Sequence, residues 1–245
     1  MTDSISHRVS NPFYARRRRR DAPVARRPHP RYARLPDAPR NASPVPGLTS
    51  LYHWDDPGNY GDRRYPGNCP GNLIRDLLLY YRPSDVLDSM TGSGTCADVC
   101  SELRVPCTSG DIRHGQDACD LDSWLTPRAA FDFVWLHPPY WRQKHYTGDP
   151  KDLSSAPTLE TFLDRYRLLI AESARVLRPG GRVAVLMGDY SDREAGFVPL
   201  TWWTKSIAFE SGLRQEVTDI VRFGHGASSS RKTYRSSFIP GLQKP

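Results

Sequence analysis

Hydrophobic and polar positions along the chain follow two alternating periods after residue 71. Helical spacing covers residues 72–81, 95–103 and 159–177, and Pro83 ends the first of these patterns. Short apolar runs at 85–88, 106–112, 131–136 and 182–189 predict strands, and RPGG, residues 178–181, predicts a turn before the last strand. Strands that alternate with helices predict an α/β fold with a mostly parallel sheet, covered by helices on both faces.

The first fifty residues lack this hydrophobic pattern, so we assign them to a tail outside the folded domain. Residues 1–50 are rich in arginine and proline and contain few apolar side chains. Such a segment cannot bury enough surface to offset its ordering entropy, so we expect a disordered tail. The chain has 245 residues and is 38% hydrophobic. That is enough for one domain with a proper core, which we expect at 51–245.

Charge is distributed unevenly between the ends and the middle of the chain. Residues 1–50 hold eleven arginines and three aspartates, and residues 222–245 hold five basic residues and no acidic one, so the middle is acidic within a total of +7. A run of five arginines, Arg16, Arg17, Arg18, Arg19 and Arg20, can neutralise phosphates and release counterions. The run favours a nucleic acid partner, although a solvated tail that only aids solubility stays open.

Cysteine usage and hydropathy narrow the class of protein further. The five cysteines show no CxxC spacing, and their odd number argues against a disulfide framework. Cys96 and Cys100 share a helix face, but without further ligands nearby in sequence we favour core thiols and predict no metal site. No apolar stretch approaches the ~20 residues of a membrane span, and the arginine-rich start lacks the apolar core of a signal peptide. We therefore expect a soluble cytoplasmic or nucleoid-associated protein without membrane contact.

The segment DVLDSMTGSGTCADVC, residues 85–100, predicts a strand, a tight glycine turn and a helix. Glycines let the backbone approach a ligand closely, and a helix start offers free N–H groups. A plain turn would look similar, since GxG is a weak signal and the third glycine of the dinucleotide motif is missing. Acidic residues at successive strand ends, Asp88, Asp111 and Asp117, favour a nucleotide-like ligand. A carboxylate after the second strand suits ribose hydroxyls, and one shortly after it could accept from an adenine amino group.

The segment FDFVWLHPPYW, residues 131–141, predicts a strand that stops abruptly. Prolines lack the N–H that a sheet requires, so the strand ends before Pro138 and Pro139, near His137. A stiff turn then presents Tyr140 and Trp141 at a strand end, where open α/β sheets bind their ligands.

In order and spacing, these motifs resemble the S-adenosylmethionine-dependent DNA amino-methyltransferases that modify N6 of adenine or N4 of cytosine. The resemblance covers most of residues 60–240 and includes YPGNCPGNLIRDLL, VLDSMTGSGT, SGDI, QDA and LHPPYW, the last in place of the family's (D/N/S)PP(Y/F/W). It implies a Rossmann-like class I methyltransferase fold with S-adenosyl-L-methionine as cofactor. The implied cofactor-binding residues are Pro66, Gly67, Asn68, Asp88, Thr91, Gly92, Ser93, Gly94, Thr95, Asp111, Ile112, Asp117 and Ala118, and the implied catalytic residues are His137, Pro138, Pro139 and Tyr140.

The resemblance also assigns roles around the substrate. Main-chain and side-chain acceptors at His137 and the proline turn would receive hydrogen bonds from an exocyclic amine, while Tyr140 would stack on the extruded base. Histidine departs from the family's Asp, Asn or Ser, and only neutral imidazole has an acceptor nitrogen. We expect Trp141, Arg142 and Lys144 to contact nucleic acid, on a segment, 141–157, that is either a mobile loop over the base or a plain surface loop.

Several alternatives stay open at this stage. An RNA amino-methyltransferase fits the arginine-rich ends, a related turn methylates protein glutamine amides, and a regulatory protein could bind the cofactor without catalysis. Neither the modified base nor the recognition sequence follows from the residues. The oligomeric state is equally open, as is a role in restriction-modification.

Overall fold

The computed structural model describes residues 43–53, 56, 58–126 and 130–222. Most of the expected tail, including Arg16 to Arg20, lies outside the described residues. Of its last eight residues, Val45 is buried and its carbonyl accepts a hydrogen bond from the N–H of Leu48. Part of the segment that we assigned to the tail therefore contributes to the packed structure.

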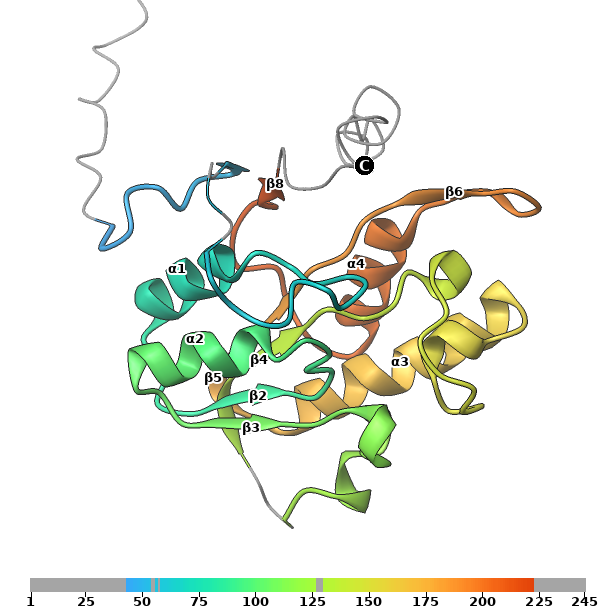
Figure 1. Ribbon diagram of the computed structural model, residues 1–245, viewed down its shortest axis with the longest axis horizontal. Helices are drawn as coiled ribbons and strands as arrows, with labels where there is room; N and C mark the ends of the chain where they lie inside the picture. Colours follow the sequence, from blue (N-terminus) through green and yellow to red (C-terminus); the bar gives the residue numbers. More distant parts are fainter. Residues whose placement is uncertain (1–42, 54–55, 57, 127–129, 223–245) are drawn as a thin grey trace, which may run out of the picture. The chain divides into compact units, whose positions relative to one another are not determined.

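Four parallel strands form the central sheet in the order β3-β2-β4-β5. They are β2 (Val86–Asp88), β3 (Cys107–Ser109), β4 (Phe131–Leu136) and β5 (Leu177–Val185). The sheet grows outward from β2 to β3 on one side and from β4 to β5 on the other (Figure 1). The strand order thus reverses between β2 and β4, which is where doubly wound sheets bind ligands.

Both faces of this sheet are covered, as the alternation of side chains along each strand requires. Val134 and Leu136 of β4 belong to a core with α3 (Leu159–Arg175) and α4 (Leu200–Glu210), whereas Phe133 and its neighbours pack with α1 and α2. The latter helices are α1 (Gly71–Tyr81) and α2 (Thr95–Leu103). The predicted parallel α/β sheet with helices on both faces is confirmed.

Local sequence signals explain where the helices begin and end. Helix α1 ends at Tyr81 and is capped by Arg82, whose φ of 50° is left-handed, directly before Pro83. Helix α2 begins after Gly94, whose φ of 86° suits glycine. Thr158 caps α3, since its hydroxyl accepts a hydrogen bond from the N–H of Thr161 at 3.1 Å. These boundaries lie within two residues of the predicted ones.

The prediction of a turn at RPGG was wrong. Strand β5 already begins at Leu177, which pairs with Phe131, and pairing resumes at Arg182 opposite Phe133. Residues 178–181 therefore face only one partner residue and form a bulge, in which Gly180 has a φ of 80°. Glycine marked an irregularity within a strand here, a signal that resembles a turn when only sequence is considered.

The remaining elements are short. Strand β1 (Leu51–Tyr52) pairs in parallel with β8 (Val221–Arg222), and β6 (Tyr190–Asp192) forms an antiparallel hairpin with β7 (Gly196–Val198). Single 3-10 turns are η1 (Ile112–His114), η2 (Leu121–Ser123), η3 (Trp141–Gln143) and η4 (Leu153–Ser155). Strand β3 is shorter than the predicted 106–112 because Asp111 caps η1.

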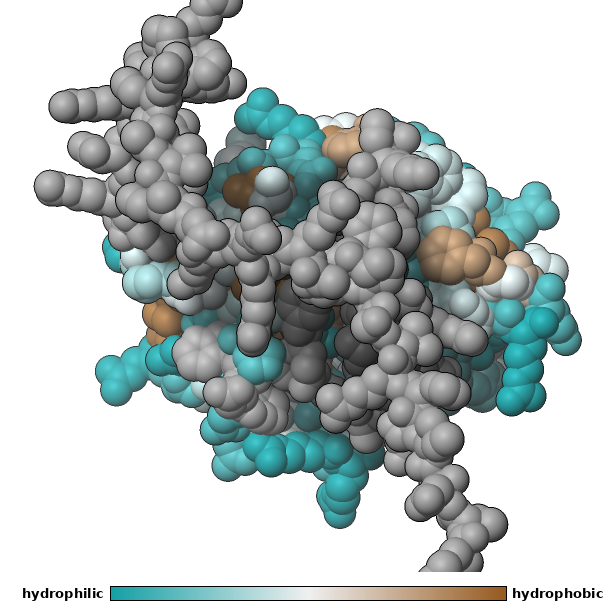
Figure 2. All heavy atoms as spheres, turned by 90° about the horizontal axis from the view of Figure 1, so that it is seen from above, coloured by the Kyte–Doolittle hydropathy of each residue, from teal (hydrophilic) through white to brown (hydrophobic). Residues whose placement is uncertain are grey.

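The described surface is mostly polar on the face seen in Figure 2, where hydrophobic residues form small separate patches between hydrophilic ones. Within the described residues, no helix combines the length and the apolar character that a membrane span would need.

Candidate functional site

The site lies at the carboxyl edge of the sheet, where β2 and β4 end side by side. Asp88 at the end of β2 is paired with Trp135 of β4, and both strands run in the same direction. The glycine corner, residues 91–94, follows β2, and the HPPY turn, residues 137–140, follows β4. Parallel pairing therefore brings two segments that are 43 residues apart, counted from Gly94 to His137, to one edge.

A single cavity connects these two segments. Together with the open solvent at its mouth, it encloses about 840 Å³. Twelve of the predicted site residues line it: Gly67, Asp88, Thr91, Gly92, Ser93, Thr95, Asp111, Ile112, Asp117, Ala118, His137 and Pro139. The glycine corner and the proline turn, each predicted to follow a strand, thus face a common cavity.

Five predicted residues lie beside the cavity without lining it: Pro66, Asn68, Gly94, Pro138 and Tyr140. Asn68 still has a clear structural task. Its side-chain oxygen accepts hydrogen bonds from the hydroxyls of Ser93 at 2.9 Å and Thr95 at 2.6 Å. It thereby fixes the segment before α1 to the glycine corner.

The glycine corner is held in shape by the neighbouring strand. The N–H of Thr91 donates to the carbonyl of Gly110 at 2.9 Å, and the N–H of Gly92 donates to the Asp111 carboxylate at 2.9 Å. Gly92 has a φ of 50°, and a Cβ there would lie 3.0 Å from the ring of Tyr65. Backbone of this conformation, packed this closely, leaves little room for a side chain.

Asp111 is the most heavily hydrogen-bonded carboxylate of the site. It accepts from the N–H of Gly92 and from the backbone and guanidinium of Arg113, at about 2.9 Å each. Burial raises the pKa of Asp111, but the hydrogen bonds and charge of Arg113 outweigh burial, and the net pKa lies below its usual value. Arg113 also packs over the ring of Tyr65, 4.8 Å from its centroid.

Asp88 differs from Asp111, because few groups compensate its burial. The side chain is 2% exposed, and one oxygen accepts from the N–H of Met90 at 3.2 Å. Burial raises the pKa of Asp88 to about 8, so the carboxyl is largely protonated at neutral pH. The neighbouring Ser89 hydroxyl also lines the cavity and is buried without a hydrogen-bond partner among the described residues. The two residues form a polar wall with unused hydrogen-bonding capacity.

Asp117 is buried at the far side of the cavity. Both its carboxylate oxygens accept from one guanidinium nitrogen of Arg165 at 3.0 Å, and one oxygen accepts from the N–H of Cys119 at 2.9 Å. A carboxylate offers about four acceptor positions, so one oxygen keeps room for a further donor.

His137 lies in the cavity wall directly after β4. Within the described part of the chain, no side chain or N–H donates a hydrogen bond to its ring. Burial lowers the pKa of His137 to about 4, and the charges of Arg222 and Lys144 act in the same direction. The imidazole is therefore neutral at physiological pH and keeps an acceptor nitrogen.

Tyr140 is half-buried beside the cavity-lining His137. Its ring centroid lies 6.0 Å from that of His137, and a Cβ on Gly188 would lie 3.2 Å from the Tyr140 ring. Burial raises the pKa of Tyr140 to about 12. Arg222 of β8 is near enough to influence the pKa values of both residues, and one of its guanidinium nitrogens is buried without a partner among the described residues.

The structure corrects the expectation for Trp141. It is 3% exposed, and its indole N–H donates to the carbonyl of Ala156 at 2.9 Å, so it packs in the core and offers no surface to nucleic acid. Its φ of 48° turns the chain sharply away from the HPPY turn. Arg142 pairs with Asp192 and Glu194, both at 2.7 Å, whereas Lys144 is exposed.

Several cavity residues were not predicted, most of them on segments without a motif. They are Tyr65, Cys69, Arg113, Gln116, Tyr146, Thr147, Lys151 and Asp152. Tyr146 stacks on Tyr65 at 5.9 Å between ring centroids, and the buried Asp152 accepts from the backbone and hydroxyl of Thr147 at 2.9 Å. Within the segment 141–157, residues 146–147 and 151–153 thus form part of the cavity wall, whereas residues 142–145 are exposed. The interleaved aromatic and basic residues of this segment were the one signal in the sequence.

Comparisons with known proteins give limited likeness. No protein-family model matches the chain, and no curated protein matches it. Among solved structures, one of a Thermus thermophilus protein described as a candidate DNA modification methylase has 26% identity and a TM-score of 0.29, over 39% of this chain and 38% of that chain. A second structure of that protein, complexed with S-adenosyl-L-methionine, has 25% identity and a TM-score of 0.29 over the same shares. The match therefore spans well under half of either chain.

Proposed function

We propose that the chain is an S-adenosylmethionine-dependent methyltransferase of the Rossmann-like class I fold, which methylates an exocyclic amino group of a nucleic acid base. The modified atom would be N6 of adenine or N4 of cytosine, and DNA is the favoured substrate. The observation that carries this proposal is the shared cavity. Gly92 of the glycine corner and His137 of the HPPY turn line it together, so a cofactor at the first would lie beside a substrate at the second.

The residues around the glycine corner fit the proposed cofactor. The buried Ser89 hydroxyl lacks a partner among the described residues, and Asp117 has an acceptor position left. The Asp111 carboxylate would accept hydrogen bonds from the ribose hydroxyls, once Arg113 gives up some of its own hydrogen bonds to Asp111. The Asp117 carboxylate would accept a hydrogen bond from the adenine amino group. When bound, S-adenosylmethionine supplies an electrophilic methyl group on its sulfonium.

The HPPY turn fits an amine substrate. An exocyclic amine is a poor nucleophile, because its lone pair is delocalised into the ring. Neutral His137 can accept a hydrogen bond from this amine, and Pro138 and Pro139 hold a main-chain carbonyl in a rigid position nearby. The low pKa of His137 supports this role, since the imidazole stays an acceptor well below pH 6. Tyr140 would need to leave its place against Gly188 to stack on a base.

Nucleoside analysis after methylation tests the proposal directly. The full chain is incubated with S-adenosylmethionine carrying a labelled methyl group and with duplex DNA, single-stranded DNA or RNA, and the products are digested to nucleosides. We expect label in N6-methyladenosine or N4-methylcytidine of the deoxy series. Label in ribonucleosides alone would replace DNA by RNA as the substrate.

Two variants separate catalysis from fold effects. His137→Asn keeps a side-chain acceptor and should keep activity, whereas His137→Leu removes the acceptor and should lose it, with cofactor binding unchanged in calorimetry. His114→Asn is a matched control on the exposed end of η1. Equal activity of His137→Leu and the parent would exclude an acceptor role for His137.

A second candidate function is cofactor binding without catalysis. The observation that favours it is the position of Tyr140, which packs against Gly188 and does not line the cavity. Calorimetric uptake of S-adenosylmethionine together with no label in any nucleic acid would support this candidate. No uptake at all would reject both.

A further inference from the structure

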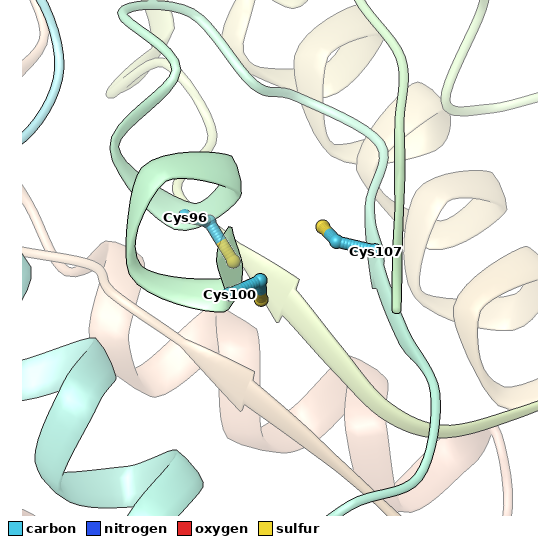
Figure 3. A group of neighbouring side chains, drawn as sticks. All are labelled: Cys96, Cys100 and Cys107. Atoms are coloured by element: carbon cyan, nitrogen blue, oxygen red, sulfur yellow. The ribbon is translucent and has the colours of Figure 1, made fainter. Parts of the chain in front are cut away.

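Three cysteine sulfurs meet between helix α2 and strand β3. Cys96 and Cys100 lie four residues apart on α2 and therefore on one helix face, and Cys107 begins β3 opposite them. Figure 3 shows the three side chains pointing toward the same space. Their sulfur atoms all lie within 4.8 Å of one another. All five cysteines of the chain are free thiols.

From this geometry we propose that Cys96, Cys100 and Cys107 bind one thiophilic metal ion through three thiolates. A Zn–S bond is about 2.3 Å long, so three sulfurs around one such ion lie roughly 4 Å apart. Because no separation exceeds 4.8 Å, the sulfurs need at most a small contraction to reach this arrangement. Sulfur ligands select soft ions such as Cu⁺, Zn²⁺ and Cd²⁺ over Mg²⁺ or Ca²⁺. The sequence paired only Cys96 with Cys100, and the third ligand comes from the tertiary structure.

The surroundings favour a largely buried site with three protein ligands. Cys96 and Cys100 are 1% and 0% exposed and belong to the core formed with α1. Among the described residues, no other cysteine, histidine or acidic side chain joins this group. The Ser109 hydroxyl is 3.6 Å from the Cys107 sulfur and can donate to a thiolate there. Hydrogen bonds to thiolate sulfur orient metal ligands in many sites.

Binding of the ion would replace the protons of the three thiols. It therefore releases protons and weakens in acid.

The position of the site ties two elements of the candidate cofactor cavity together. Cys96 lies in the first turn of α2, two residues after Gly94, and itself lines the cavity. Cys107 lies on β3, which leads to Asp111. A bound ion would therefore crosslink α2 to β3 and raise the stability of this half of the sheet. The metal site does not depend on the proposed methyl transfer.

Titration of the reduced, metal-free full chain with Cd²⁺ tests the proposal. We expect saturable binding of one ion per chain with thiolate-to-cadmium absorption, and a higher melting temperature that a chelator reverses. Cys107→Ser should weaken cadmium binding by at least about 100-fold. Mutation of residues that only hydrogen-bond to metal ligands already lowers metal affinity by about 10–100-fold. Cys119→Ser is the matched control, because Cys119 is a buried thiol outside the trio whose sulfur donates to the carbonyl of Arg165.

X-ray absorption of the cadmium-loaded parent chain keeps the proposal testable if Cys107→Ser does not fold. Three sulfur neighbours around the ion would support the site. Fewer than three sulfurs, equal affinity of Cys107→Ser, loss of binding in Cys119→Ser, or no saturable binding would overturn it.

Discussion

Protonation of His137 should cost the folded protein stability in mild acid. Burial, together with the charges of Arg222 and Lys144, lowers the pKa of His137 to about 4, whereas an unfolded histidine titrates near 6.5. Between these two pH values the unfolded chain binds more protons than the folded one. The free energy of unfolding must then fall as the pH falls from about 6.5 to about 4.

The magnitude follows from the difference of about 2.5 pKa units, each equivalent to about 1.4 kcal/mol. His137 alone should therefore remove about 3 kcal/mol from the free energy of unfolding by pH 4, relative to pH 7. A loss of this size is large for a protein whose total stability is of the order of 5–15 kcal/mol. Below pH 4 the contribution is constant, because both states are then protonated.

Urea denaturation from pH 4 to pH 7 measures this effect in the parent and in His137→Asn. The asparagine side chain does not titrate in this pH range. Relative to the parent, the free energy of unfolding of His137→Asn should therefore be about 3 kcal/mol higher at pH 4 than it is at pH 7. His114→Asn, at an exposed position, serves as control and should follow the parent. Parallel curves for the parent and His137→Asn would refute the buried neutral imidazole, and with it the acceptor role below pH 6.

Three further predictions test the site and its supports. Gly67→Ala places a Cβ 2.5 Å from the Tyr146 hydroxyl at a φ of 93°, so it should weaken cofactor binding in calorimetry. The control Gly115→Ala, at a φ of 77°, meets no atom within 4 Å and should show only backbone strain of about 1–2 kcal/mol; equal cofactor affinities would argue against a steric role for Tyr146. Asp111→Asn leaves Arg113 without its ionised partner and should lose about 1–3 kcal/mol at pH 7 in urea denaturation. This loss should shrink as the pH falls below the ordinary pKa of aspartate, because the Asp111 carboxylate is then increasingly protonated; a pH-independent loss would contradict the pairing. Trp141→Phe removes the hydrogen bond to the buried carbonyl of Ala156 and should cost about 1–3 kcal/mol while DNA affinity stays constant, and a selective loss of DNA affinity would restore a nucleic acid role for this residue.

The strength of local signals explains which parts of the site could be predicted. Glycines with positive φ, prolines that end a strand and carboxylates at strand ends leave marks at fixed positions in sequence. Gly92, His137 and Asp111 were predicted for these reasons, and all three line the cavity. Tyr65, Tyr146 and Lys151 line it as well, although no backbone constraint of glycine or proline fixes their positions.

Misassignments arose where one signal has two structural meanings. Glycines at 180–181 mark a bulge inside β5 and not a turn, because the strand resumes pairing with the same neighbour. Trp141 follows the proline turn in sequence, yet its left-handed backbone directs the indole into the core toward Ala156. The sequence around an aromatic residue does not show whether its side chain is exposed at a site or buried in the core.

By itself, the sequence determined the alternation of strands and helices and the turns at the ends of β2 and β4, since these depend on periodicity and on the backbone limits of glycine and proline. Only the tertiary structure decided which segments became neighbours. The parallel pairing of β2 with β4 joined Gly92 and His137 in one cavity, and the packing of α2 on β3 brought Cys107 to Cys96 and Cys100. Such contacts depend on the order of the strands in the sheet and on which side chains become buried. The sequence around each residue does not reveal either of these when the partners are far apart in the chain.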